Sequence, residues 1–383
     1  MKNSRRLKIC IISTIKNPHI IRWYRALVSC GIDVIIITCE PNEPEIADIN
    51  VIECISSRSR FYFKNLLFQF KHTLHISSIL EKLKPDIVHI HSFDYIHPLM
   101  IALTNYCTKK FENLVISTWG TDVIGDQKKG SVNLGLIAKK MLLKQAEEIT
   151  ATSHYLASLT AKMAPKNKNI HIIPFGIDCE QFKRSNENNV RNKFRIGFIK
   201  HLIKKYGPEY LIKSVAEIRK NFDNVELIMV GHGEMKDDLK KLAKNLGIEN
   251  CVKFTGYICN EKIPSILSCL DICVMPSIIE AFGVSAIEAQ AMEVPVVASK
   301  VGGIPEVVLD GVTGILVEPE NIEELKSAIK KLIENPLLRK NMGKAGRKFV
   351  LKHYNIEENV LLFKNLYYKI AEEKSASTAL CNC

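Results

Sequence analysis

Short apolar runs bounded by turn residues alternate with longer amphipathic stretches along the whole chain. This alternation is typical of parallel strands joined by helices and predicts an α/β fold. In the first half, the expected strands are Leu7–Ile12, Asp33–Thr38, Val51–Ile55, Ile87–His91, Leu114–Thr118, Glu148–Thr152 and Ile170–Ile173. The clearest helical stretches between them are Ile20–Ser29, Phe61–Leu83 and Leu134–Gln145.

The polar segment Lys183–Lys193 has the composition of a linker, and a new run of strands and helices follows it. The expected strands of this second half are Phe194–Ile199, Val225–Val230, Val252–Thr255, Ile272–Met275, Val296–Ser299 and Gly314–Val317. The expected helices are Pro208–Asn221, Lys236–Leu246, Lys262–Ser268, Val284–Met292, Ile322–Glu334 and Pro336–Lys352. The sequence therefore predicts two domains, 1–190 and 191–354, with a helix at 355–373 that packs back on the first domain and a tail at 374–383.

Length and composition agree with two ordinary domains, because 383 residues exceed one typical core and 46% of them are apolar. The longest apolar run, at 32–38, is far shorter than a membrane-spanning helix. The basic start at 1–8 is followed by too short an apolar stretch for a signal peptide. The expected location is therefore the cytoplasm, with the inner face of the membrane as a second location.

Charge and cysteine content limit the partners. The 12 cysteines are scattered, without a CxxC pair or a Cys/His cluster, so neither a metal site nor a bound cofactor is predicted. The net charge is +12, and residues 1–190 carry 25 Lys and Arg against 17 Asp and Glu. A basic surface attracts phosphorylated ligands, anionic membranes or nucleic acid, but the chain has no nucleic-acid-binding motif, so nucleic acid is not an expected partner.

The segment from Glu280 to Glu288 follows an expected strand and opens a helix. Backbone N–H groups of Phe282, Gly283, Val284 and Ser285, together with the helix dipole, can hold a diphosphate there. Glu280 could accept hydrogen bonds from sugar hydroxyls, and Glu288 lies one turn into the helix, within reach of a ribose diol. Two glutamates eight residues apart are also common on solvated surfaces.

A second candidate lies at the end of the strand Phe194–Ile199. Lys200 and Lys205 follow this strand, and two cations at the carboxyl end of a strand can neutralise a diphosphate. By itself, a lysine-rich loop is equally typical of a solvated surface. Gly231-His232-Gly233 and Thr255-Gly256-Tyr257-Ile258 follow two further expected strands, so several strand ends point to one crevice.

Taken together, these motifs resemble glycosyltransferase family 4, the retaining group with the GT-B fold. The resemblance covers nearly the whole chain and is strongest from Phe194 to Glu318. It rests on the pattern ExFGxxxxE at 280–288, the basic pair Lys200 and Lys205, and the segments at 230–233, 295–299, 302–306 and 311–314. It implies two Rossmann-like domains that face each other across a cleft, with a nucleotide-sugar donor held by the C-terminal domain and an acceptor by the N-terminal domain.

Carried over by position, the resemblance implies that Lys200 and Lys205 bind the donor diphosphate and that Glu288 binds the ribose. Backbone groups near Ile258 would contact the base. Glu280 would hold the donor sugar and, with the two lysines, form the catalytic group. The lysines would offset the leaving-group charge that Mg²⁺ neutralises in other enzymes.

The first half matches less closely. The loop at 13–19 lacks the glycines usual in relatives, and His19 at its end could face the acceptor. Trp119 stands where many relatives have the histidine of a His-Gly-Ser-Asp run, and Asp122 matches the aspartate. His91, at the end of an expected strand, either lines the cleft or packs in the core.

The resemblance predicts transfer of a hexose from a UDP- or GDP-sugar to a saccharide or lipid-linked saccharide, in the synthesis of a surface polysaccharide or glycoconjugate. Same-face attack and double displacement through Glu280 both give retention; we favour the same-face route. The alternatives are a sugar-nucleotide epimerase and a non-catalytic nucleotide-sugar-binding protein of similar fold.

The stretch 58–72 combines five Phe or Tyr residues with four Lys or Arg residues. Such a segment either lies in an anionic headgroup layer or forms a core helix of the N-terminal domain. The charge of the first half favours peripheral membrane contact and a lipid-linked acceptor.

Overall fold

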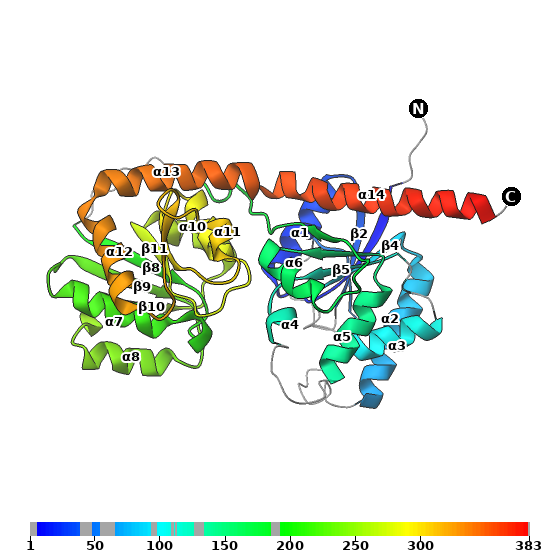
Figure 1. Ribbon diagram of the computed structural model, residues 1–383, viewed down its shortest axis with the longest axis horizontal. Coiled ribbons are helices and arrows are strands. Elements are labelled where there is room, and N and C mark those ends of the chain that lie inside the picture. Colours follow the sequence, from blue (N-terminus) through cyan, green and yellow to red (C-terminus); the bar gives the residue numbers. More distant parts are fainter. Residues whose placement is uncertain are drawn as a thin grey trace. The chain divides into compact units, whose positions relative to one another are not determined.

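The computed structural model describes residues 6–38, 48–53, 66–92, 98–108, 111, 113–125, 134–184 and 192–381, without the side chains of 66–72, 121, 134 and 375–381. The chain forms two compact units (Figure 1). Unit 1 consists of Met1–Gly176 and Ile356–Cys383, and unit 2 of Ile177–Asn355. Each unit contains a parallel sheet with helices, so the predicted α/β class is confirmed.

The sheet of unit 1 has the strand order β3-β2-β1-β4-β5-β6-β7, and all its paired strands run parallel. The strands are β1 (Lys8–Ile12), β2 (Asp33–Thr38), β3 (Val51–Glu53), β4 (Ile87–His91), β5 (Leu114–Thr118), β6 (Glu148–Ala151) and β7 (Ile170–Ile172). The helices are α1 (Pro18–Ser29), α2 (Leu66–Leu83), α3 (Pro98–Thr108), α4 (Thr121–Ile124), α5 (Leu134–Gln145), α6 (His154–Ala161) and α14 (Ile356–Cys381).

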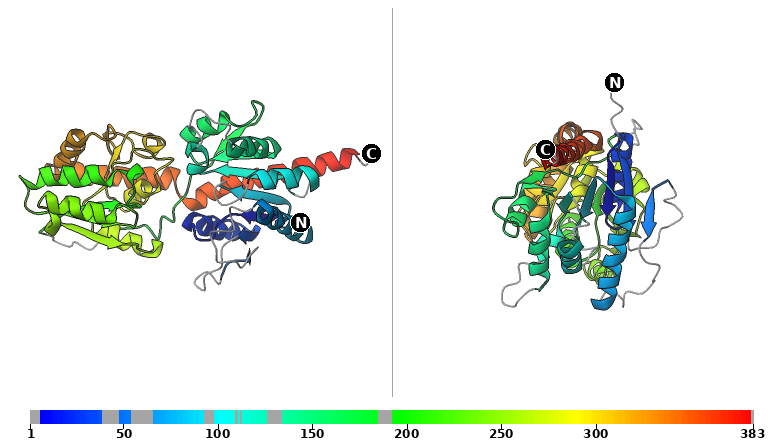
Figure 2. Two further views of the ribbon diagram at one scale, coloured as in Figure 1. Left: turned by 90° about the horizontal axis from the view of Figure 1, so that it is seen from below. Right: turned by 90° about the vertical axis from the view of Figure 1, so that its right-hand side faces the viewer.

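Helices lie on both faces of this sheet (Figure 2), and the alternate residues of β1 pack against different ones. Ile9 and Ile11 belong to a buried cluster that also contains residues of α1 and α14. Cys10 and Ile12 belong to a second cluster, formed with residues of α2, α3 and α5. Because side chains alternate along a strand, β1 buries one pair of residues on each face of the sheet.

Unit 2 has the strand order β10-β9-β8-β11-β12-β13, again with parallel pairs. Its strands are β8 (Phe194–Ile199), β9 (Val225–Val230), β10 (Val252–Gly256), β11 (Ile272–Met275), β12 (Val296–Ser299) and β13 (Gly314–Val317). Its helices are α7 (Pro208–Arg219), α8 (Lys236–Asn245), α9 (Ile263–Ser268), α10 (Val284–Ala291), α11 (Ile304–Val307), α12 (Ile322–Glu334) and α13 (Pro336–His353). Residues of α7, α8 and α12 share one buried cluster with the sheet.

The units divide after Gly176, earlier than the boundary expected at residue 190. Arg347 of α13 explains the difference, because its guanidinium donates to the carbonyls of Phe182 at 2.6 Å and Cys179 at 2.9 Å. The N–H of Ile177 also donates to the carbonyl of Tyr354 at 2.9 Å. These bonds attach 177–182 to unit 2; of the expected linker, residues 185–191 lie outside the described residues.

The C-terminal helix belongs to unit 1. Ile356, Val360, Phe363, Tyr367 and Ile370 of α14 are buried in the same cluster as β1 and α1. The helix continues to Cys381, so the expected tail after residue 373 is helical up to that point.

No described helix has the length and hydropathy needed to cross a membrane. The aromatic and basic stretch at 58–72 lies outside the described residues, apart from the backbone of 66–72 at the start of α2.

Candidate functional site

The candidate residues of unit 2 gather where its sheet reverses direction. β8 and β11 are neighbours in the sheet, and the chain moves outwards from them in opposite directions. In open parallel sheets, this position at the carboxyl ends of the strands leaves a crevice where ligands bind. Lys200 follows β8 directly, and the segment that contains Glu280 follows β11.

Lys200 and Glu280 form an ion pair at this edge. The ammonium Nζ donates to Oε2 of Glu280 at 2.6 Å, and the side chains are only 12% and 9% exposed. Charge-assisted hydrogen bonds of this length are strong, and leaving one buried partner unpaired is costly. The two side chains therefore fix each other's position.

Electrostatics keep Lys200 charged. Burial favours the neutral form of Lys200, but the charge of Glu280 favours the ammonium form. Tyr206, the hydrogen bond to Glu280 and the charge of Glu288 act in the same direction as the charge of Glu280. The net effect raises the pKa of Lys200 above its ordinary value of 10.5. An ammonium has three N–H donors, so Lys200 can bind Glu280 and an anionic ligand together.

Lys205 is half-buried on the loop after β8. Its Nζ lies 4.9 Å from the ring centre of Tyr206, and Nζ of Lys200 lies 4.8 Å from the same ring. A ring face attracts cations at these distances, so Tyr206 helps to hold both ammonium groups. Sequence reasoning did not select Tyr206, although it directly follows Lys205.

The N-terminus of α10 is attached to the end of β8. The hydroxyl of Ser285 donates to the carbonyl of Ile199 at 2.9 Å, so the first turn of α10 lies beside the strand that leads to Lys200. The first N–H groups of a helix, here those of Val284 and Ser285, have no partner within the helix and can bind an anion. Phe282 contributes backbone only, because its side chain is buried against Tyr354 with ring centres 5.7 Å apart.

Two glycines allow close approach at this edge. Gly283 caps α10 with a φ of +107°, and a Cβ there would lie 2.7 Å from Cδ1 of Ile304. Gly231, with a φ of +135°, would place a Cβ 2.0 Å from the carbonyl oxygen of Lys200. A larger residue at either position would displace the loops that carry the candidate residues.

Glu288 is buried in the second turn of α10, and its charge contributes to the raised pKa of Lys200. Ile258 is half-buried after β10, next to Tyr257, which is 72% exposed. The rings of His232 and Tyr257 are 6.0 Å apart, and those of His201 and His232 are 4.8 Å apart. These rings form a row of aromatic contacts that ends at Tyr257, the neighbour of Ile258; base binding near Ile258 stays a prediction.

In unit 1, His19 and Trp119 lie together at the carboxyl end of the sheet. His19 stacks on Phe175 at 4.4 Å and meets Trp119 edge-on at 6.2 Å. Asp122 is fully buried, and its carboxylate accepts hydrogen bonds from the N–H groups of Trp119 and Gly120. Asp122 thus stabilises the loop that carries Trp119; acceptor binding by the three residues stays a prediction.

His91 is packed in the core of unit 1. Its side chain is fully buried against Trp119 and Phe363, and neither ring nitrogen has a hydrogen-bond partner within the described residues. Burial lowers the pKa of His91 to about 3, so its imidazole is neutral near pH 7.

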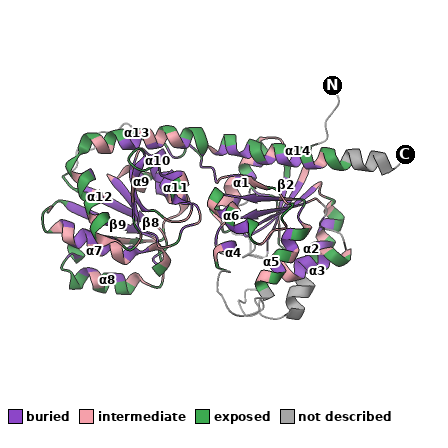
Figure 3. Cartoon of the chain, viewed as in Figure 1, coloured by how far each residue is buried: buried purple, intermediate pink, exposed green. Residues whose placement is uncertain are grey.

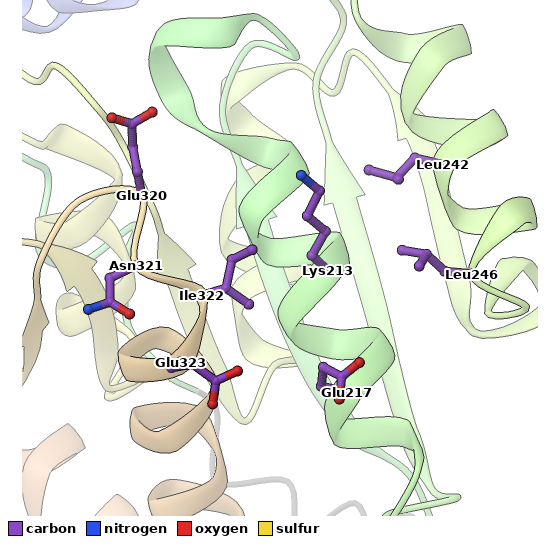
Figure 4. A pocket seen from close by; sticks show the side chains of 8 residues that line it. All are labelled: Lys213, Glu217, Leu242, Leu246, Glu320, Asn321, Ile322 and Glu323. Carbon is purple, nitrogen blue, oxygen red and sulfur yellow. The ribbon is translucent and has the colours of Figure 1, made fainter.

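Unit 2 also has a groove of about 700 Å³ that contains none of the candidate residues (Figure 4). It is lined by residues of α7, α8 and the start of α12: Lys213, Glu217, Leu242, Leu246, Glu320, Asn321, Ile322 and Glu323. Each of its three carboxylates already has a partner, namely Lys220, Tyr210 or Lys326.

The sheet order of both units and the strand-end site of unit 2 define the class of GT-B glycosyltransferases. Sucrose-phosphate synthase from Thermosynechococcus elongatus has a similar structure, with a TM-score of 0.80 and 21% identity over 95% of this chain and 99% of that chain. Anabaena HepE, solved in complex with UDP, has a TM-score of 0.77 at 18% identity, covering 95% of this chain and 100% of its own. These likenesses confirm the predicted fold.

Sequence comparison identifies the family. The profile described as "Glycosyl transferases group 1" matches residues 180–349, and "Glycosyl transferase 4-like" matches residues 8–153. The chain belongs to glycosyltransferase family 4, as its motifs predicted.

Individual relatives match part of the chain. An uncharacterized glycosyltransferase of Methanocaldococcus jannaschii is 33% identical over 60% of either chain. A GDP-mannose-dependent α-(1-6)-phosphatidylinositol monomannoside mannosyltransferase of Mycolicibacterium smegmatis is 29% identical over 57% of this chain and 61% of its own. The chain thus spans about 60% of the length of these two relatives.

Proposed function

We propose that the protein transfers a hexose from a UDP- or GDP-sugar to a saccharide or lipid-linked saccharide, with retention of anomeric configuration. The observation that carries this proposal is the buried pair of Lys200 and Glu280, 2.6 Å apart, beside the N-terminus of α10. It combines a cation for a leaving diphosphate with a carboxylate for sugar hydroxyls at one strand-end edge.

The lysines act on the leaving group. Lys200 and Lys205 donate to the donor diphosphate, and the N–H groups of Val284 and Ser285 bind its oxygens together with the positive end of the helix dipole. Negative charge grows on the departing phosphate oxygen in the transition state, so fixed cations stabilise it more than the ground state. The reaction therefore proceeds without a divalent metal.

The carboxylates orient the rest of the donor. Glu280 accepts hydrogen bonds from the sugar hydroxyls while it keeps its bond to Lys200, and Glu288 accepts from the ribose diol. Backbone groups near Ile258 contact the base. Binding energy from these distant groups positions the anomeric carbon for attack.

Transfer takes place on one face of the sugar. The bond between the anomeric carbon and the phosphate oxygen breaks, and a bond to the acceptor hydroxyl oxygen forms on the same face. The acceptor proton moves to the departing phosphate oxygen, which leaves a nucleoside diphosphate and a glycoside with the original configuration.

Relatives support the substrate classes in this proposal. The mycolicibacterial relative is named for GDP-mannose and phosphatidylinositol monomannoside, and HepE was solved with UDP-glucose. A lipid-linked acceptor would bring the protein to a membrane surface, where the segment 58–72 is the sequence-based candidate for contact. Synthesis of a surface polysaccharide or glycoconjugate fits such a reaction.

A panel of UDP- and GDP-sugars tests the proposal through two measurements, thermal shift and release of nucleoside diphosphate. A glycosyltransferase is expected to be stabilised by one donor and to release its nucleoside diphosphate. An epimerase would change the sugar and leave the nucleotide attached, and a binding protein would show the thermal shift alone. Activity should survive EDTA; a loss that Mg²⁺ or Mn²⁺ restores would contradict the metal-free reaction.

A further inference from the structure

Helix α13 has an unusual charge composition. Its 18 residues include six Lys and Arg and neither Asp nor Glu. Its two arginines serve the fold: Arg347 donates to backbone carbonyls of unit 2, and Arg339 donates to the carbonyl of Leu332 at 2.6 Å. The four lysines of α13 instead lie exposed on one side of the helix.

Lys340, Lys344, Lys348 and Lys352 follow one another at intervals of four residues, and all four are exposed. Residues four apart lie on the same side of a helix, about 6 Å from each other along its axis, so the lysines form a stripe about 18 Å long. The buried residues Met342, Gly343, Gly346 and Val350 lie on the opposite side of α13. Figure 3 shows both exposed and buried positions along α13 in unit 2.

Four other lysines of unit 2 have acidic partners close by in the sequence, whereas in the described part of the chain the stripe lysines have none. Lys220, Lys241, Lys326 and Lys330 each pair with an acid three or four residues away on their own helix. Within the described residues, none of the four stripe lysines has an ion pair within 4.0 Å. Four like charges on one helix face repel one another, so a negatively charged surface would stabilise them.

Two leucines accompany the stripe. Leu337 is 71% exposed and Leu351 is 42% exposed. By helical position, both lie within the arc covered by the lysines, one near each end of the helix. Cations interleaved with exposed leucines match the boundary between lipid headgroups and acyl chains.

We propose that this face of α13 binds an anionic phospholipid surface. The lysines contact lipid phosphates and Leu337 and Leu351 enter the headgroup layer. The leucines favour a lipid surface over a nucleic acid, which offers phosphates without an adjoining apolar layer. The inference rests on α13 alone and requires neither the proposed transfer reaction nor the segment 58–72.

Flotation of the full chain with vesicles tests this proposal. The probes are phosphatidylcholine vesicles with and without phosphatidylglycerol, at low and at high salt. We expect binding to the anionic vesicles at low salt and a loss of binding at high salt, because screening weakens exposed charges. Each cation near an anionic surface contributes about fivefold to binding, so replacing all four stripe lysines by Gln should lower the partition coefficient at least tenfold, a conservative bound.

The matched control replaces Lys220, Lys241, Lys326 and Lys330 by Gln. It changes the net charge by the same amount but leaves the stripe intact, and it should retain most of the binding. A third variant, Leu337→Ala with Leu351→Ala, should bind the anionic vesicles less well than the parent at low salt. Circular dichroism verifies that all variants are folded.

Four results would overturn the proposal. The first two are no binding of the parent chain to anionic vesicles and equal losses in the two lysine variants. The third is binding of a duplex oligonucleotide in preference to vesicles. The fourth is a stripe variant that binds as well as the parent, which would place the contact elsewhere on the chain. Donor turnover with a soluble acceptor should be the same in all three variants, so it separates this test from that of the transfer reaction.

Discussion

The carboxylate of Glu288 is buried on α10, near the charge of Lys200. If it binds the ribose of the donor, Glu288→Ala removes hydrogen bonds to a charged acceptor. Such bonds contribute about 1.5–3 kcal/mol, so the Kd for the nucleotide sugar should rise roughly 10- to 100-fold. Isothermal titration calorimetry measures this change, with Glu334→Ala, an exposed acid of α12, as the control. Equal affinity in both variants would disprove the ribose assignment.

Lys200 and Lys205 carry the leaving-group charge in the proposed reaction. Replacing both by Ala should lower kcat more than about 100-fold, because even one lost donor to a developing anion costs that much in other enzymes. Lys204→Ala is the control, since Lys204 is exposed on the same loop. A folded double variant that turns over at the parent rate would refute the role of the two lysines.

The raised pKa of Lys200 predicts a response to alkaline pH. Its folded-state pKa exceeds the unfolded value of 10.5, so its contribution to stability is complete below about pH 10.5 and is lost as pH rises through the folded pKa. The Tm difference between the parent and Lys200→Met should therefore stay constant up to about pH 10.5 and narrow above it. Calorimetry over this pH range tests whether the Tm difference narrows. A difference that already closes near neutral pH would mean that Lys200 is not held charged.

Strands β8, β9 and β10 share a charge cluster at their amino ends, away from the candidate site. Glu226 of β9 is buried and contacts Lys253 at 2.7 Å, Arg195 at 3.0 Å and Lys193 at 3.7 Å. Burial raises the pKa of Glu226, but the Lys253 hydrogen bond and the three cations outweigh it and hold this pKa below 4.5. The ionised carboxylate therefore stabilises the sheet above that pH.

Glu226→Gln should lower the free energy of unfolding by about 2 kcal/mol at pH 7, because the charge-assisted bonds are lost. The difference from the parent should shrink as pH falls below about 4.5, because the unfolded chain then takes up a proton on Glu226, and it should vanish once pH has fallen through the lower folded-state pKa. Urea unfolding at several pH values measures it. Glu217→Gln removes an exposed acid and should leave the free energy of unfolding nearly unchanged. A pH-independent effect of Glu226→Gln would point to packing alone.

Most elements of unit 2 could be predicted from the sequence. β8, β9 and β11 begin and end at the expected residues, because charged or turn residues bound their apolar runs. Two helices of unit 1 were harder to foresee. α3 is apolar on several sides and shows no amphipathic period, and α6 has only 8 residues, too few for a periodic pattern.

The candidate site could be predicted in part. Its strand ends were identifiable, since Lys200 and Glu280 each follow a clear apolar run. Their contact, across 80 residues, depends on the adjacency of β8 and β11, which local sequence does not determine. The hydroxyl of Ser285 is likewise used to attach α10 to β8, a role that requires the three-dimensional packing.

At the scale of the whole molecule, unit 1 depends on α14. Deleting the chain after Asn355 would expose the apolar residues that pack against α14 and remove the hydrogen bond, 2.6 Å long, between His89 and Tyr367. Burying one such side chain contributes about 1.5–3 kcal/mol, and several are lost, which is comparable to the whole stability of a domain.

The truncated chain should therefore lose the thermal transition of unit 1 and keep that of unit 2. Differential scanning calorimetry resolves the two thermal transitions, and limited proteolysis shows which unit is unfolded. A shorter truncation after residue 374 is the control, because the buried residues of α14 precede it. Two intact transitions after truncation at Asn355 would contradict this dependence.

Because α14 returns to unit 1, the ribosome makes the two units in a nested order. Gly176 is synthesised long before Ile356, and all of unit 2 is translated in between. At typical elongation rates of about 5–20 residues per second, unit 1 waits roughly 10–40 s for the helix that covers one face of its sheet. During this interval the surface of β1 and α1 that α14 covers stays exposed, and unit 2 becomes complete at its end, before α14 is made. The later-made unit is thus complete first, and the nascent first unit is the part of the chain that needs protection during synthesis.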